Sequence, residues 1–157
     1  MSGVDRTMYF VDREKIERTL CYFEELQAHV ETVSNSEKRT DQLALERVAI
    51  GLIESILDVG NGMIDGFIMR DPGSYEDIID ILEDERVITE QTAASLKRVI
   101  KLRKSLVQDY LDIDHSEVSR ILLEHQKEYA MFADAVRAYL NKELGPVSAF
   151  LPEPKKG

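Results

Sequence analysis

One basic side chain interrupts an otherwise apolar helix face in this sequence. This face is formed by residues at the three- and four-residue spacing of a helix: Leu96, Val99, Leu106 and Tyr110. Arg103 fills the step that is missing from this series. A guanidinium in that position needs a carboxylate partner or a water-filled cleft. The simplest explanation is an ion pair with an acid of the preceding apolar segment, for which the candidates are Glu54, Asp58 and Asp65.

The same stretch reverses the sign of the chain's charge. The chain has a net charge of −10, which disfavours general binding to nucleic acids by long-range repulsion. Between residues 97 and 104 there is no acid, whereas the basic residues are Lys97, Arg98, Lys101, Arg103 and Lys104. Two interpretations stay open. Composition favours a solvated face that pairs with neighbouring acidic helices, and the alternative is a phosphate-binding surface with Lys97, Lys101 and Lys104 as candidates.

Other reactive side chains are sparse and poorly spaced for a metal site. The histidines stand far from one another, at His29, His115 and His125, and Cys21 is the single cysteine. Zinc-ligand spacing is therefore absent, and Cys21 is expected to pack on an apolar helix face. Glu54 and Asp58 form an i,i+4 carboxylate pair, but no Glu-x-x-His motif accompanies it. We expect no metal and no cofactor.

The periodicity that positions these residues is helical throughout. The chain has 157 residues, and all four prolines lie at positions 72, 146, 152 and 154. We expect an all-α, up-and-down helical bundle in one domain, residues 1–145, followed by a mobile Pro-rich tail, residues 146–157. The sequence predicts about five helices, over residues 13–33, 40–69, 75–82, 89–110 and 115–144. Four glycines in the second helix require close packing or a kink: Gly51, Gly60, Gly62 and Gly66.

The sequence also favours a cytoplasmic protein. One cysteine excludes an intrachain disulfide, which fits a reducing compartment. The N-terminus lacks the apolar region of a signal peptide. The most apolar stretch, residues 48–69, contains three carboxylates and is not expected to span a membrane.

The segment Arg103–Tyr110 resembles a known family motif. It reads Arg-Lys-Ser-Leu-Val-Gln-Asp-Tyr, which resembles the Arg-x4-His-x-Tyr segment of the HepT-like branch of the HEPN superfamily. The turn at residues 72–75 and the link at residues 111–114 resemble the same branch. The opening Tyr9–Ile16 is similar to YutE-type members from bacilli. The resemblance covers roughly residues 9–144.

This resemblance implies a dimerising HEPN-like bundle and a metal-independent endoribonuclease. Active members are often toxins that pair with a nucleotidyltransferase antitoxin, and a local basic cleft would bind RNA. Arg103 would then hold the phosphate, and Tyr110 would be the residue that the antitoxin adenylylates. Gln108 occupies the histidine position, and an amide cannot act as a general acid or base near neutral pH.

Three hypotheses follow from these residues. The first is a weakened endoribonuclease toxin with Arg103 and Gln108 at its catalytic site. The second is a non-catalytic homodimeric module that binds a protein or a nucleotide. The third, a metal–carboxylate bundle, rests on Glu54 and Asp58 alone. On a regular helix Arg103 and Tyr110 share a face while Gln108 points away, so a joint site requires a helix distortion or a second subunit.

Overall fold

A computed structural model describes residues 9–146, and that part of the chain is helical. The predicted all-α class is confirmed, whereas most of the tail, residues 147–157, lies outside the described residues. The α-helices are α1 (Arg13–Gln27), α2 (Val30–Val33), α3 (Arg39–Gly66), α4 (Tyr75–Asp84), α5 (Glu90–Ile100), α6 (His115–Tyr129) and α7 (Phe132–Leu144). Between α5 and α6 lie a π-helix, η2 (Lys104–Gln108), and a 3₁₀ helix, η3 (Tyr110–Asp112).

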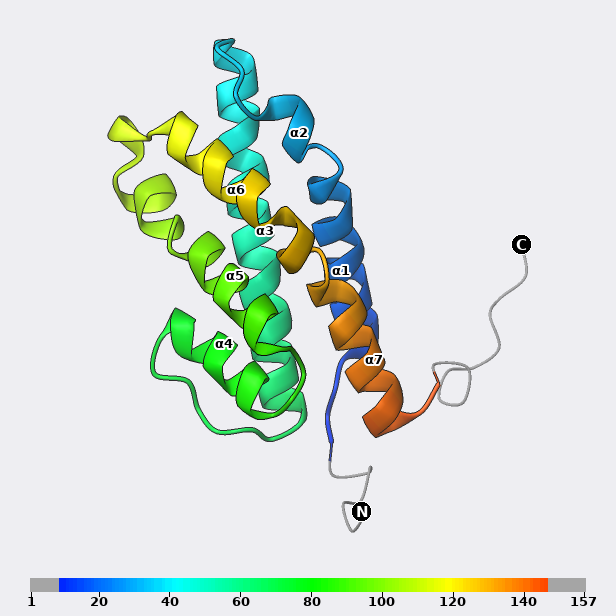
Figure 1. Ribbon diagram of the computed structural model, residues 1–157. Coiled ribbons are helices and arrows are strands. Elements are labelled where there is room, and N and C mark those ends of the chain that lie inside the picture. The colour runs from blue at the N-terminus through cyan, green and yellow to red at the C-terminus, as the bar shows by residue number, and fades with distance from the viewer. Residues whose placement is uncertain (1–8, 147–157) are drawn as a thin grey trace, which may run out of the picture.

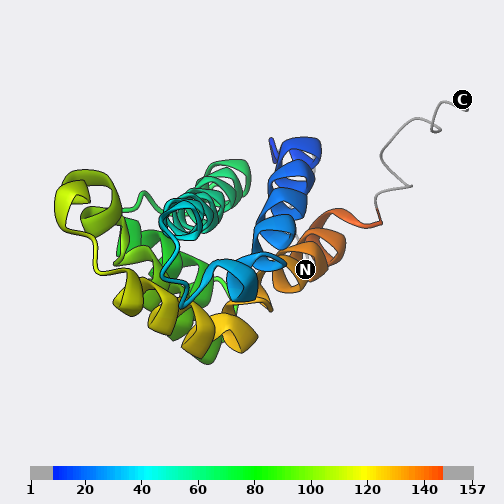
Figure 2. The same ribbon diagram turned by 90° about the horizontal axis from the view of Figure 1, so that it is seen from above.

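The long helix α3 is the centre of the bundle. It contacts α1 on one side and α4 and α5 on the other, and α6 packs against it as well (Figures 1 and 2). The predicted second helix buries two apolar stripes: Leu45, Val48, Leu52, Ile56, Val59 and Met63 form one, and Ile53, Leu57, Gly60 and Ile64 form the other. The helix ends at Gly66, short of the predicted residue 69, and Ile68 is exposed. A narrow exposed stripe remains along α3 and includes Leu43, Arg47, Asp58, Asn61 and Asp65.

Close packing within the bundle explains the glycines of α3. A β-carbon on Gly60 would overlap Cγ2 of Ile78 in α4, and one on Gly51 would overlap Cδ1 of Leu26 in α1. The helix continues without a break through both positions. Gly51 and Gly60 therefore allow neighbouring helices to approach α3, and the helix is not interrupted at either.

Three predicted helices are each divided in the structure, and the helix predicted over residues 89–110 forms α5, η2 and η3. The segment 13–33 forms α1 and α2, and the segment 115–144 turns at Ala130 and Met131 between α6 and α7. The second turn lets Tyr129 and Phe132 both pack edge-on against Phe23, with ring centroids 6.3 and 5.6 Å apart. Burial of three aromatic rings in one cluster stabilises this turn, because edge-to-face packing adds to the burial of apolar area.

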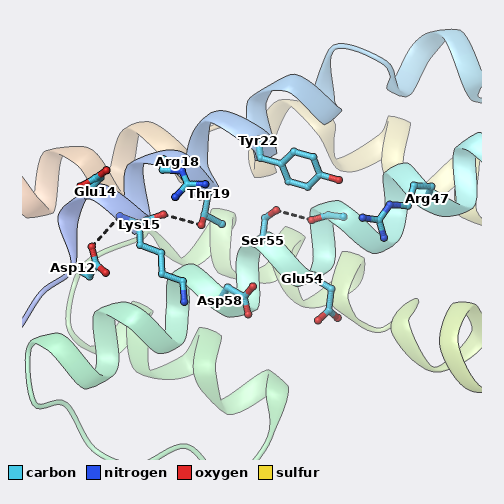
Figure 3. Close-up of a pocket in the computed structure, with 11 residues that line it drawn as sticks. Asp12, Glu14, Lys15, Arg18, Thr19, Tyr22, Arg47, Glu54, Ser55 and Asp58 are labelled. Atoms are coloured by element: carbon cyan, nitrogen blue, oxygen red, sulfur yellow. Dashed lines mark hydrogen bonds between the residues drawn. The ribbon is translucent and has the colours of Figure 1, made fainter.

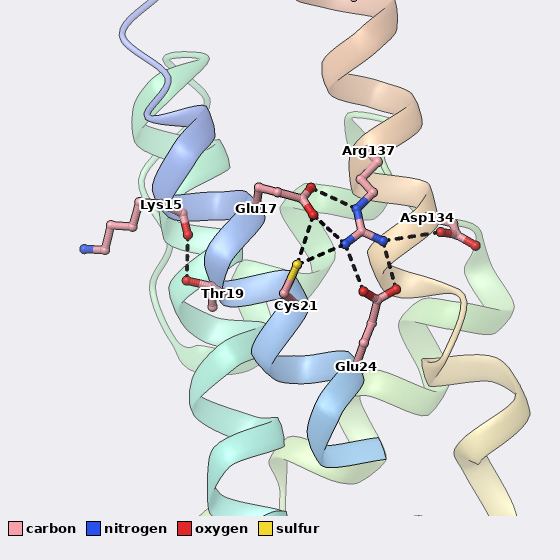
Figure 4. A network of polar contacts seen from close by, with 7 residues as sticks. All are labelled: Lys15, Glu17, Thr19, Cys21, Glu24, Asp134 and Arg137. Carbon is pink, nitrogen blue, oxygen red and sulfur yellow. Dashed lines mark hydrogen bonds and ion pairs between the residues drawn. The ribbon is translucent and has the colours of Figure 1, made fainter. Parts of the chain in front are cut away.

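A charged network fastens α7 to α1 (Figure 4). Arg137 Nη2 lies 2.7 Å from Glu17 Oε2, and its Nη1 lies 2.8 Å from Glu24 Oε2. Hydrogen bonds from Arg137 lower the pKa of both carboxyl groups. Cys21 is exposed beside this network, with Sγ 3.2 Å from Glu17 Oε2, so the expectation that it packs on an apolar face was wrong. The Glu17 carboxylate raises the pKa of the Cys21 thiol.

None of the helices within residues 9–146 has the length and apolar character needed to cross a membrane.

Candidate functional site

A π-helix distorts the chain where the motif begins. After α5 the chain forms η2, and the Asp109 N–H donates to the Lys104 carbonyl at 3.1 Å, an i to i+5 hydrogen bond. Arg103 and Gln108 are also five residues apart, and both line one hollow between η2 and the start of α4. The helix distortion that a joint site requires is therefore present within a single chain.

The guanidinium of Arg103 is held by two neighbours. Its Nε donates to Glu54 Oε1 at 2.8 Å, and the group lies over the Tyr75 ring, 4.8 Å from the centroid. Of the three acids that the sequence offered as partners, the structure selects Glu54, whose hydrogen bond raises the pKa of Arg103. Within residues 9–146, Nη1 and Nη2 have no hydrogen-bond partner. These two nitrogens can bind an anion in the hollow.

The three candidate lysines have different surroundings. Lys97 forms an ion pair with Asp80 of α4, and Lys101 Nζ lies 3.9 Å from Glu76 Oε1 of the same helix. The hydrogen bond that Lys97 donates to Asp80 raises the pKa of Lys97. Lys104 has no ion-pair partner in the described part of the chain, and it lines the hollow together with Lys101. Pairing with an acidic helix thus explains Lys97 and Lys101, which leaves Lys104 beside Arg103 as a free cation.

Tyr110 lies apart from Arg103. It is the first residue of η3, is 64% exposed, and borders a second hollow that Gln108 also lines. Arg103 does not line that second hollow. The shared face of Arg103 and Tyr110 was expected for a regular helix, and the π-turn and the following 3₁₀ turn change the angular spacing along this segment.

Neither hollow contains an imidazole that could replace the missing histidine. His115 Nε2 lies 2.7 Å from Glu46 Oε2, and His125 Nδ1 lies 3.1 Å from Ser95 Oγ. Both histidines bridge pairs of helices and line neither hollow. Gln108 is therefore the polar side chain at the position where proton transfer would be needed.

The carboxylate pair of α3 does not form a metal site in the described residues. Glu54 is engaged with Arg103, and residues 9–146 contain no group of three or more potential ligands among His, Cys, Asp and Glu. Tyr75 is the part of the site that reasoning from the sequence missed. It follows Ser74, the N-cap of α4, but no local pattern indicates that its ring meets Arg103.

Comparison with known proteins agrees with these features. The YutE protein of Bacillus subtilis is 53% identical over 143 residues, which cover 91% of this chain and 99% of YutE. Its solved structure, described as a cytosolic protein of unknown function, has a TM-score of 0.85 and covers 90% of this chain and 99% of that one. The mRNA nuclease HepT of Shewanella oneidensis is 25% identical over 85 residues, 54% of this chain and 64% of HepT.

A more distant structure shares the fold. The tri-AMPylated HEPN toxin of Shewanella oneidensis, solved in complex with its MNT antitoxin, is 20% identical with a TM-score of 0.70. The match covers 78% of this chain and 96% of that toxin. The family model described as ribonuclease HepT-like matches residues 13–136. The chain therefore belongs to the HepT-like family of the HEPN superfamily.

Proposed function

We propose that this protein binds RNA in the hollow of Arg103 and Gln108 and cleaves it slowly, without a metal ion. The observation that carries this proposal is the π-helix, because it brings both motif positions to one hollow. Kinship with YutE, an RNase candidate, and with the mRNA nuclease HepT supports RNA as the substrate.

The side chains of the hollow suit phosphate binding better than proton transfer. Arg103 is fixed by Glu54 and presents two free nitrogens, so it can stabilise the negative charge that develops on a phosphate. Gln108 can donate or accept a hydrogen bond, and it can orient a ribose hydroxyl. Since it cannot take up a proton, catalysis is limited to orientation and electrostatic stabilisation.

Removal of Arg103 tests this proposal. We expect Arg103→Ala to lower the rate of cleavage of a labelled RNA in EDTA by about 10²–10³-fold, the cost of removing one charge-stabilising donor. Arg120→Ala is the matched control, because Arg120 is exposed and pairs with Glu124 within α6. Equal cleavage by the wild-type protein and Arg103→Ala would contradict the proposal.

Gln108 itself favours a second candidate function, a binding module without catalysis. In this case the hollow binds RNA or a nucleotide and releases it unchanged. Wild-type protein that binds RNA through Arg103 but yields no cleavage product over hours would establish the module and exclude the nuclease.

We further propose that the protein is a homodimer whose interface runs along the exposed stripe of α3. Arg47 and Asp58 are exposed on α3, border the open groove between α1 and α3, and have no ion-pair partner within residues 9–146 (Figure 3). They are eleven residues apart, close to three turns, and so lie on one face of the helix. A two-fold axis between them would set Arg47 of each copy against Asp58 of the other.

Charge reversal tests this interface. We expect Arg47→Glu to shift the protein toward monomer in analytical ultracentrifugation, because four carboxylates would then meet at the axis. The double variant Arg47→Glu with Asp58→Arg should restore the dimer. A monomeric wild-type protein at micromolar concentration would contradict the proposal.

We also propose a nucleotidyltransferase antitoxin as partner, in the cytoplasm. Tyr110 is exposed, so its hydroxyl oxygen can attack the α-phosphate of ATP and release pyrophosphate. Distant relatives of the same fold are solved with such antitoxins, and YutE is described as cytosolic. Incubation with ATP and a nucleotidyltransferase encoded beside the gene should add one AMP to the wild-type protein and none to Tyr110→Phe.

A further inference from the structure

The ring of Tyr75 lies at the rim of the hollow, at the start of α4. Tyr75 is the first residue of α4, and the preceding Ser74 Oγ accepts from the Asp77 N–H at 3.0 Å. Asp77 Oδ2 in turn accepts from the Gly73 N–H and from Arg70 Nη1, both at 2.9 Å. These bonds hold the backbone on both sides of the tyrosine, and they place its ring beside Arg103.

Arg103 occupies only part of this ring. Its guanidinium lies 4.8 Å from the ring centroid, yet Tyr75 remains 50% exposed. The hollow that Tyr75 shares with Lys104 and Gln108 has a volume of about 400 Å³. This volume falls within the range of small-ligand sites, about 300–1,000 Å³. An aromatic ring, an amide, the cations Lys101, Arg103 and Lys104, and one carboxylate, Glu76, thus line a space that a single nucleotide can enter.

We propose that Tyr75 is the stacking surface of a nucleobase subsite. The inference rests on the proposed binding of RNA and adds the form in which RNA is bound. The base next to the phosphate on Arg103 stacks on the open part of the Tyr75 ring, while Gln108 lies at the ribose. Aromatic rings bind unpaired bases in this way in proteins that recognise single strands. The ligand is therefore an unpaired ribonucleotide segment, because a base inside a duplex has neither face free.

A simpler role for Tyr75 is to hold Arg103 by the cation–π contact alone. The two roles predict different effects on binding. A stacking surface strengthens the binding of RNA that carries bases, whereas a support for Arg103 strengthens phosphate binding whether or not a base is attached. Binding of an RNA backbone without bases therefore distinguishes the two roles.

The experiment measures dissociation constants by fluorescence anisotropy, with a labelled adenosine tetranucleotide and a labelled abasic tetranucleotide of the same backbone. We expect Tyr75→Leu to weaken binding of the adenosine tetranucleotide about 5- to 150-fold, the range for loss of one aromatic–base stack. Binding of the abasic tetranucleotide should change less than twofold. Tyr75→Phe should bind both probes as the wild type does. Phe10→Leu, which removes an exposed aromatic ring near Gly66, is the control and should leave both constants unchanged.

Each other outcome counts against a specific claim. An equal loss with both tetranucleotides would overturn the nucleobase subsite, with RNA binding by Arg103 intact. Equal binding of single-stranded RNA and a matched duplex would also overturn it. If the wild-type protein binds neither probe and Arg103→Ala changes nothing, both the subsite and the proposed RNA function fail.

Discussion

On the proposed function, a histidine at position 108 should raise the rate of RNA cleavage. Gln108 is exposed and lines the hollow that contains Arg103. A substitution there costs about 0.5 kcal/mol of stability or less, because no core contact is lost. The new imidazole in Gln108→His would lie beside the phosphate-binding nitrogens of Arg103, where it could transfer protons during cleavage.

The size of the gain follows from the surroundings of the hollow. A positioned general acid or base contributes about 10²–10⁴-fold to a rate. The carboxylate that lines this hollow, Glu76, faces Lys101 across 3.9 Å. The imidazole would lack a carboxylate to orient it, so we expect the lower end of that range, about 10²-fold. The gain should peak near pH 6–7, since an ordinary histidine has a pKa of about 6.5.

The assay is single-turnover cleavage of a labelled RNA in EDTA from pH 5 to pH 8. Val107→His is the matched control, because Val107 is an exposed neighbour on the same π-helix that lines neither hollow. An equal gain from Val107→His would show that any added imidazole suffices. If Gln108→His binds RNA as tightly as the wild type but cleaves it no faster, the assignment of position 108 to the reacting centre is refuted.

Two further predictions concern stability. Arg137→Met should lower the free energy of unfolding at pH 7 by about 1 kcal/mol, because its glutamate partners are partly exposed and screened. Those carboxyl groups have lowered pKa values, so their contribution is present above their usual value of 4.5 and fades as the pH falls through the lowered values. Urea denaturation at pH 7 and pH 3.5 should show the difference shrink, and a difference independent of pH would contradict the ion-pair explanation. Gly60→Ala should destabilise by about 1–3 kcal/mol through overlap with Ile78. Gly62→Ala should raise the free energy of unfolding by up to about 1 kcal/mol, because its β-carbon would lie 3.5 Å from the nearest atom, in α1, an ordinary contact distance. Thermal denaturation measures both variants. An equal loss of stability in Gly62→Ala and Gly60→Ala would refute the packing explanation.

The sequence predicts which segments are helical better than where they are interrupted. Apolar periodicity indicates α3, and the helices predicted over residues 75–82 and 89–110 begin within one residue of α4 and α5. The turn between α6 and α7 has no glycine or proline to announce it. It forms because Tyr129 and Phe132 both reach Phe23, a contact across more than one hundred residues that local pattern cannot show.

The candidate site illustrates the same limit more sharply. Spacing alone indicates that Arg103 is out of place, and the acids of α3 are correctly proposed as its partners. The π-helix that unites Arg103 with Gln108 has no signal in residue type, because neither proline nor glycine occurs between them. A regular helix would place Gln108 on a different face from Arg103. The sequence alone therefore does not predict that the two side chains line one hollow within a single chain.

This distortion also decides how the replacement of histidine by Gln108 should be interpreted. If position 108 had left the hollow, the protein would have lost both the geometry and the chemistry of a nuclease. Gln108 instead lines the hollow with Arg103, and Glu54 and Tyr75 still hold the guanidinium. The change is therefore one of proton transfer at a retained position. On the proposed function, Gln108→His should therefore change the cleavage of RNA more than its binding, whereas Arg103→Ala should weaken both.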